Sequence, residues 1–302
     1  MQQEVDAVNL GSLAKQVLED TDGSVVGEIV SVFPHSLYIK SVNGELIFVT
    51  CQQLRSPISV NLDSKINLPQ NVKQEDTAFL RGDQIRLGES TLINLSRAKT
   101  YIAKTKTQLH QLAVTKDALH LGSLILMIVD NKLSVLDQAG LANGGASKFV
   151  SNGVLPFRRS SDIDLIRNAG RLIIGLGTGF TPSGDDLLGG FLATYNSFTK
   201  LMGRPTINLS FNTLEGKTNW ISAKLLDYMQ RQILDEQMSG LLASSASRRS
   251  DFILALETLL SRGHTSGIDI LVGALLALCL VHDVTQKDDM TTVIARNLGL
   301  LV

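Results

Sequence analysis

Residues 182–190 read Pro-Ser-Gly-Asp-Asp-Leu-Leu-Gly-Gly, and residues 265–273 read Thr-Ser-Gly-Ile-Asp-Ile-Leu-Val-Gly. Aligned at an offset of 83 residues, the two stretches share the pattern S-G-x-D-x-L-x-G. A serine before an apolar stretch is typical of the first residues of a helix. Two similar polar helix starts in one apolar half of the chain predict a single site built from two similar pieces.

A glycine-rich turn precedes the first copy. Residues 175–181 read Gly-Leu-Gly-Thr-Gly-Phe-Thr. Glycine lets the backbone turn sharply and approach a ligand closely, and the free N–H groups at a helix start favour an anion. No Gly-Lys-Ser/Thr follows, which excludes a P-loop, and the dinucleotide fingerprint is incomplete. We therefore expect substrate binding at the turn and at both helix starts, through Gly177, Thr178, Gly179, Thr181, Ser183, Gly184, Ser266 and Gly267.

Three carboxylates in the two copies, Asp185, Asp186 and Asp269, are the main catalytic candidates. Unpaired carboxylates would repel a neighbouring phosphate. They are compatible with one if they bind a divalent metal such as Mg²⁺ that bridges to it, or if they accept hydrogen bonds from an amide or ammonium group. One of them acting as a general base is a third possibility. The structural alternative is that they stabilise the helix dipole, by about 0.3–1 kcal/mol.

Further candidates lie around the two copies. His264 precedes the second copy and is a candidate catalytic base or ligand, with a capping role as the alternative. Thr218 and Ser222 are one helical turn apart and are expected to face the site, unless Thr218 is only a helix cap. Arginine side chains bind carboxylates and phosphates in bidentate geometry. The arginines considered for this role are Arg158, Arg159 and Arg171.

Glycines inside both predicted helices indicate close packing. Gly190 and Gly273 each follow an aspartate, Asp186 and Asp269, by four residues and so share its helix face. Glycine inside a helix costs about 1 kcal/mol relative to alanine, and close contact between helices compensates for that cost. The pattern predicts that the two helices cross at these glycines and bring both aspartates to one pocket.

The chain as a whole predicts an α+β protein with a β-rich domain over residues 1–105, a barrel or sandwich, and a mostly helical domain over 106–302. Residues 4–20 have the apolar spacing of an amphipathic helix. Asn43-Gly44 predicts a hairpin between β-branched runs. The other predicted strands lie within 24–51 and at 58–62, 85–87 and 92–95. The predicted helices begin near 107 and continue, after a linker at 143–148, at 162–173, 183–200, 218–235, 250–261, 266–282 and 289–298.

Bulk properties exclude several classes of protein. The chain has 302 residues and a net charge of −1, which argues against nucleic acid as a partner. Two cysteines, Cys51 and Cys279, form no disulfide or zinc pattern and suit a reducing compartment. The first residues lack the apolar core of a signal peptide, and the longest apolar run, 270–281, is too short to span a bilayer. We therefore expect a cytoplasmic protein with a small anionic substrate and no membrane partner.

The stretch from Gly175 to Gly190 resembles the hallmark of a bacterial family long labelled as a domain of unknown function. One branch of that family is the AllH-type subunit of oxamate carbamoyltransferase. Residues 263–269 and 218–222, and the order of a β-rich part before a helical part, are similar as well. Thr178 and Phe180 stand where the family pattern has proline and leucine.

The resemblance implies the reaction of oxalurate with phosphate to give oxamate and carbamoyl phosphate. It implies phosphate or an oxyanion at the amide-rich turn, ureido N–H groups at the three aspartates, and an arginine at the oxamate carboxylate. The S-T-R-T motif of the better-known carbamoyltransferases is absent. The resemblance also implies other subunits as partners. A non-catalytic, anion-binding scaffold subunit is the alternative function.

Overall fold

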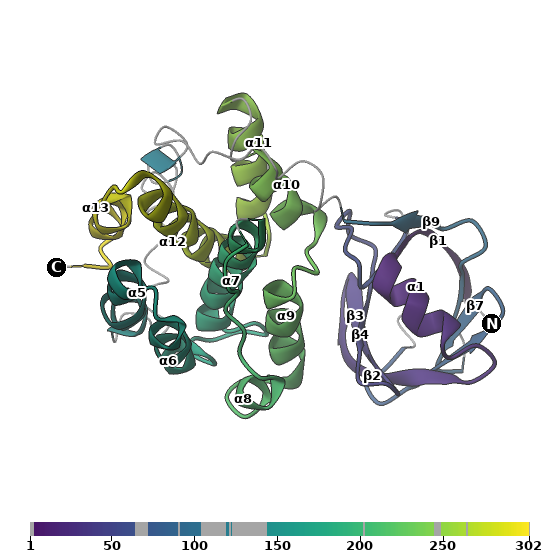
Figure 1. Ribbon diagram of the computed structural model, residues 1–302. Coiled ribbons are helices and arrows are strands. Elements are labelled where there is room, and N and C mark those ends of the chain that lie inside the picture. The colour runs from purple at the N-terminus through teal and green to yellow at the C-terminus, as the bar shows by residue number, and fades with distance from the viewer. Residues whose placement is uncertain are drawn as a thin grey trace. The chain divides into compact units, whose positions relative to one another are not determined.

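The structure is a computed structural model. It describes residues 3–63, 72–89, 91–103, 119–120, 122, 144–201, 203–244, 249–263 and 265–301. The chain divides into two compact units, one formed by Met1–Ala103 with Leu234–Glu236 and the other by Lys104–Ile233 with Gln237–Val302. Figure 1 labels the elements of both. Most of the stretch expected to be helical from residue 107 to residue 129 lies outside the described residues.

The first unit is a β-barrel. Its strands follow the order β5-β4-β3-β2-β6-β7-β8-β1, and β1 also pairs with β5, so eight strands close on themselves. A ninth, β9, pairs with the end of β1 in parallel. The strands are β1 (Gln3–Gly11), β2 (Val25–Phe33), β3 (Ser36–Ser41), β4 (Leu46–Thr50), β5 (Ser59–Leu62), β6 (Thr77–Arg81), β7 (Gln84–Leu87), β8 (Thr91–Asn94) and β9 (Lys99–Tyr101).

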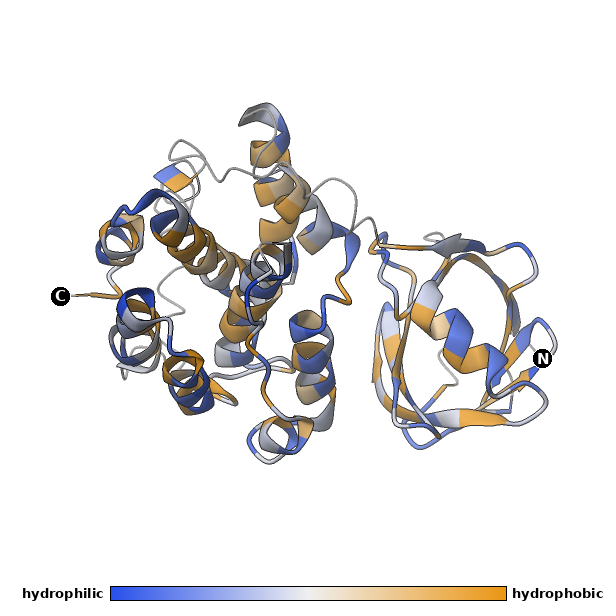
Figure 2. Ribbon diagram, in the orientation of Figure 1, coloured by the Kyte–Doolittle hydropathy of each residue, from blue (hydrophilic) through white to orange (hydrophobic). Residues whose placement is uncertain are grey.

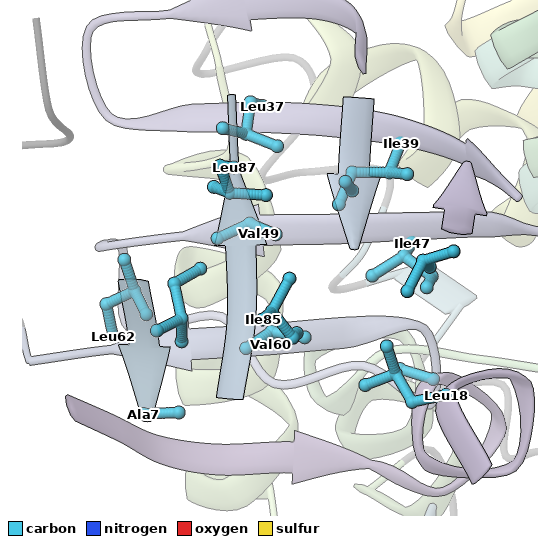
Figure 3. Packing of buried hydrophobic residues seen from close by; sticks show 14 of the residues in the cluster. Ala7, Leu18, Leu37, Ile39, Ile47, Val49, Val60, Leu62, Ile85 and Leu87 are labelled. Atoms are coloured by element: carbon cyan, nitrogen blue, oxygen red, sulfur yellow. The ribbon is translucent and has the colours of Figure 1, made fainter. Parts of the chain in front are cut away.

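Apolar side chains fill the barrel. Alternate residues of the strands point inward, as the two-residue period of a strand requires, and helix α1 (Ser12–Glu19) adds Ala14, Val17 and Leu18 to the same cluster. Figure 3 shows Leu18 beside the side chains that the strands contribute. Between the two predicted architectures, barrel and sandwich, the structure selects the barrel, and the α+β class is confirmed.

The predicted helix over residues 4–20 is wrong in its first half, which is strand β1. Glu4 and Asp6 are exposed, whereas Val5 and Ala7 are buried, so the burial alternates every two residues. The helical apolar spacing of the residues that follow is longer than this alternation, so the sequence alone favours a helix over the whole stretch. Pairing of β1 with β5 and β8 closes the barrel and overrides local preference.

The predicted hairpin at Asn43-Gly44 is confirmed. Strands β3 and β4 pair antiparallel on either side of it. Gly44 has φ +72, in the region that glycine tolerates without strain. Strands β6 and β9 were not predicted. β9 has only three residues, too few to show an alternation.

The second unit is helical. Two of its helices, α7 (Ser183–Leu201) and α12 (Ser266–Gln286), carry the repeated sequence pattern, and both were predicted. The others are α4 (Ala146–Phe149), the π-helical turn η3 (Val150–Val154), α5 (Leu155–Ser160), α6 (Ile163–Ile173), α8 (Phe211–Glu215), α9 (Trp220–Gln230), α10 (Glu236–Ser244), α11 (Arg249–Leu260) and α13 (Met290–Asn297).

Several predicted boundaries need correction. The helix expected over 218–235 ends at Gln230, and the described part of the expected linker at 143–148 belongs to a helical segment. The N-cap of α9 lies one residue after the candidate cap Thr218. Asp162 caps α6 and Asn219 caps α9, each accepting a hydrogen bond from the backbone two or three residues ahead. An aspartate or asparagine caps a helix as well as serine or threonine does, so the neighbouring residues could not be ranked by type.

Helix α12 is apolar along most of its length, as Figure 2 shows. By length and hydropathy it is the one described helix that could cross a membrane. Within the structure 94% of its most apolar window is buried, the situation of a helix at the core of a globular unit. The helix extends beyond the apolar run 270–281 on both sides.

Candidate functional site at two helix starts

Helices α7 and α12 cross at the glycines that the sequence singled out. A Cβ atom added to Gly190 would lie 2.0 Å from the carbonyl oxygen of Ile270, and one added to Gly273 would lie 1.9 Å from that of Leu187. Each glycine therefore touches the backbone of the other helix, and the predicted crossing is confirmed. These two helices pack against each other more extensively than any other pair of described elements.

The repeat extends beyond the sequence pattern. In both copies a helix ends, a turn follows, and the glycine of the next helix start donates its N–H to a carbonyl of that turn: Gly184 to Leu176 and Gly267 to Arg262. A Cβ on either glycine would lie within 2.2 Å of a carbonyl of the preceding helix. The unit α6–turn–α7 is thus repeated as α11–turn–α12, with a longer turn in the first copy.

Asp185 has no counterpart in the second copy, where Ile268 takes its place. It is 1% exposed, and its carboxylate accepts three hydrogen bonds. The backbone N–H of Gly175 donates to Oδ1 at 2.7 Å, and the hydroxyls of Thr218 and Ser222 donate to Oδ2 at 2.5 and 2.6 Å. Through these three hydrogen bonds, the Asp185 carboxylate holds the glycine turn next to the start of α9.

Asp186 and Asp269 form a buried acid pair. They are 8% and 2% exposed. Burial raises the pKa of Asp186 to about 7, and the Ser266 hydroxyl, Arg262 and Thr181 only partly offset the effect. Burial likewise raises the pKa of Asp269 to about 7; the Ser183 hydroxyl lowers it and the charge of Asp186 raises it further. Each aspartate thus interacts with the serine of the other copy.

One carboxylate oxygen of this acid pair accepts no hydrogen bond from the described residues. The Oδ2 atom of Asp269 is buried and has no hydrogen-bond partner among the residues that the structure describes. A buried acceptor without a donor costs free energy, so such an atom indicates a proton or a ligand donor. Within the described residues no group of three or more His, Cys, Asp or Glu side chains is placed to hold a metal ion.

The glycine turn offers free amides. Gly177 and Gly179 have φ +112 and +113, and a Cβ on Gly177 would lie 2.8 Å from the amide nitrogen of Ser183. Among the described residues, no hydrogen-bond acceptor faces the backbone N–H groups of Gly177, Thr178 or Gly179. The amide of Gly184 is already used by Leu176. The part of the turn available to an anion is therefore residues 177–179.

Hydroxyl groups connect the turn to the acid pair. Thr181 donates to Oδ2 of Asp186 at 3.0 Å, and its hydroxyl lies 3.1 Å from that of Ser266. Among the predicted residues, the structure thus brings together Thr181, Ser183 and Ser266 with the acid pair. Thr218 and Ser222 contact Asp185 instead. His264 lies outside the described residues.

A positive charge near the acid pair was not predicted. Arg262, half-buried in the turn before α12, lies close enough to lower the pKa of Asp186. Its position directly before Gly263-His264 was the available signal. Of the predicted arginines, Arg158 is bound to Asp283 and Asp289, and Arg171 contacts Asn168 on its own helix.

Comparison with known families places both units of the chain in one class of protein, the subunits of a carbamoyltransferase. Residues 6–100 match the AllH family N-terminal domain, and residues 173–278 match the family model described as oxamate carbamoyltransferase subunit AllH. The two matches cover most of the chain, and the chain belongs to the AllH family. No solved structure matches it.

Proposed function

We propose that this protein carries a carbamoyl-transfer site at the N-terminal ends of α7 and α12 and works together with other subunits. The observation that carries the proposal is the buried acid pair with its unpartnered Asp269 oxygen. A carbamoyl or ureido group is planar and presents two N–H donors, which two neighbouring carboxyl groups can accept. The family assignment supports a transferase, and oxalurate or carbamoyl phosphate carries such a group.

The proposed reaction joins phosphate to the ureido carbonyl of oxalurate. The amides of residues 177–179 hold the phosphate, one of whose oxygens attacks the carbonyl carbon, and the partial positive charge of the same helix start stabilises the resulting oxyanion. The bond to the oxamate nitrogen then breaks, and the proton released by phosphate passes through the acid pair to that nitrogen. A carboxyl group whose pKa is about 7 exchanges protons readily at neutral pH. Arg262 is the proposed partner of the oxamate carboxylate.

The assay that tests this proposal follows phosphate release from carbamoyl phosphate and oxamate by the assembled complex. Asp186→Asn and Asp269→Asn should each lower turnover by about a hundredfold or more, because Asn neither accepts nor relays the proton. Asp251→Asn is the matched control, since Asp251 is an exposed first-turn aspartate on α11. Undiminished turnover of both site variants would instead assign this chain to the alternative, a non-catalytic anion-binding scaffold.

Phosphate binding can be tested on the chain alone. A crystal soaked in phosphate should show the anion at the amides of Gly177, Thr178 and Gly179. Gly177→Ala should weaken phosphate binding, because the added methyl group would lie 2.8 Å from the amide nitrogen of Ser183 at a φ of +112, so the turn would have to shift. An empty turn at saturating phosphate would contradict the anion site. The chain has only two cysteines, far apart in the sequence, a content that suits the reducing cytoplasm, which we propose as the compartment.

A further inference from the structure

A second hollow lies in the helical unit, away from the acid pair. It has a volume of about 270 Å³. Tyr195 lines it and follows Asp186 on α7 by nine residues, or about 13 Å along the helix axis. Leu280 and Val281 line it from the second half of α12. The proposed reaction uses none of these residues.

Most of the wall is apolar and firmly held. Phe157 and Ile163 join Leu280 and Val281 in the lining. The ring of Phe157 packs edge-on against Tyr195 with ring centroids 5.5 Å apart, and the ring of Phe191 is parallel to that of Tyr195 with centroids 6.0 Å apart. Pockets for small molecules are mostly apolar with a few placed polar groups, and their volumes begin at about 300 Å³. A hollow of this size therefore suits a ligand of a few carbon atoms.

One end of the hollow is cationic. Arg204 lines it, and its guanidinium forms no ion pair with any residue in the described ranges. The charge of Arg204 lowers the pKa of Tyr195, whereas burial, the larger effect, raises it to about 12. Tyr195 is therefore a neutral hydroxyl donor next to a positive charge. The described lining contains no aspartate or glutamate that would compete for Arg204.

We propose that this hollow binds a small monocarboxylate with a branched apolar group. The carboxylate would pair with Arg204 and accept a hydrogen bond from the Tyr195 hydroxyl, while the apolar group would contact Phe157 and Leu280. Arginine pairs with a carboxylate through two parallel hydrogen bonds, and the apolar wall excludes strongly hydrated anions such as phosphate.

Calorimetric titration of the full chain with 3-methylbutanoate tests this site. The wild-type protein should bind 3-methylbutanoate. Acetate, which lacks the branched apolar group, and 3-methylbutanamide, which lacks the negative charge, should each bind at least about tenfold more weakly. Arg204→Gln should weaken binding by about tenfold or more. Val284→Phe, which places a ring in the lining, should abolish it, and Arg171→Gln, an exposed arginine on α6, should leave it unchanged.

The proposal would be overturned by the absence of binding heat for the wild-type protein at millimolar 3-methylbutanoate, or by equal affinity in Arg204→Gln. Equal affinity for 3-methylbutanamide would also overturn it, because the cation would then have no role. Asp186→Asn should bind 3-methylbutanoate as the wild type does, so the outcome is independent of whether the acid pair is catalytic.

Discussion

Asp185 and Asp186 are neighbours in the chain, yet their surroundings differ completely. Asp185 accepts hydrogen bonds from three groups of this chain, whereas burial destabilises the charged form of Asp186. A buried carboxylate with a full set of donors stabilises the fold, and one with too few donors opposes it. The sequence distinguished them by position only, since Asp186 matches Asp269 in the second copy and Asp185 has no counterpart. The role of Asp185 depends on its contacts with Gly175, Thr218 and Ser222, which the sequence did not predict.

Asp185→Asn should destabilise the protein by about 1–3 kcal/mol, because the amide group cannot accept all three hydrogen bonds and adds an unmatched N–H donor. Chemical denaturation measures the change. Asp164→Asn is the control, since Asp164 is an exposed first-turn aspartate on α6 and should change stability by less than about 0.5 kcal/mol. An equally small effect at Asp185 would contradict its positioning role.

The acid pair should make stability depend on pH. The pKa of Asp186 is about 7 in the folded protein and near its ordinary value of 3.8 in the unfolded chain, so the folded state holds more protons between these values. Stability should therefore fall as the pH rises from about 4 to about 7 and level off above it. Asp186→Asn cannot ionise and should be more stable than the wild type by about 1–3 kcal/mol at pH 8.

Melting temperatures of both proteins between pH 4 and pH 8 provide the measurement. The difference between variant and wild type should grow with pH and be small at pH 4. Because the same variant is expected to lose turnover, the combination of higher stability and lost activity would separate a strained functional acid from a helix cap. A variant less stable than the wild type at pH 8 would exclude the raised pKa.

At the scale of elements, both α7 and α12 begin at the predicted residue, because serine starts, regular apolar spacing and helical glycines all agreed; α7 ends one residue and α12 four residues beyond the predicted end. The crossing was predictable for the same reason. Strand β1 was not predicted, because it depends on partners far away in the sequence, β5 and β8. The helical segment at 146–160 was not predicted either, because the run Asn143-Gly144-Gly145 indicates a linker, whereas η3 packs on α6 further along the same stretch of chain.

Gly190→Ala should destabilise the protein by about 1–3 kcal/mol or more, because the new methyl group would meet the backbone of α12 and not a side chain that can move. Gly240→Ala is a matched control. Gly240 also lies inside a helix, α10, but its Cβ would meet nothing within 4 Å, so alanine should stabilise by about 0.4–1 kcal/mol. Thermal melts of the two variants should shift in opposite directions; a shared direction would contradict the crossing contact.

At the scale of the whole molecule, the order of a β-rich part before a helical part was predictable from the change in apolar spacing. Closure of the barrel was not, since it depends on pairing between β1 and β5 across more than forty residues. The Arg262 contribution to the site likewise required the fold, because the residue reaches Asp186 from the other copy.

The barrel should fold without the helical unit. Its apolar cluster draws only on residues between Val5 and Ala98, and its strands close on themselves. A fragment of residues 1–103 should therefore show a β-type circular dichroism spectrum and a cooperative melt. This fragment lacks Glu236 and therefore the ion pair between Arg55 and Glu236, whose side chains are 50% and 25% exposed. Loss of this ion pair should lower the free energy of unfolding by no more than about 1 kcal/mol. A fragment without a cooperative melt would show that the barrel depends on the second unit.

The α6–turn–α7 and α11–turn–α12 units meet around an approximate two-fold axis, because Gly190 touches Ile270 as Gly273 touches Leu187. In a symmetric dimer every substitution appears on both sides of such an axis. With both units in one chain, each side can change alone. Asp185 of the first copy aligns with Ile268 of the second, and only the first copy has the longer glycine turn. The chain can therefore present two unlike walls to an asymmetric substrate, which two identical subunits cannot do.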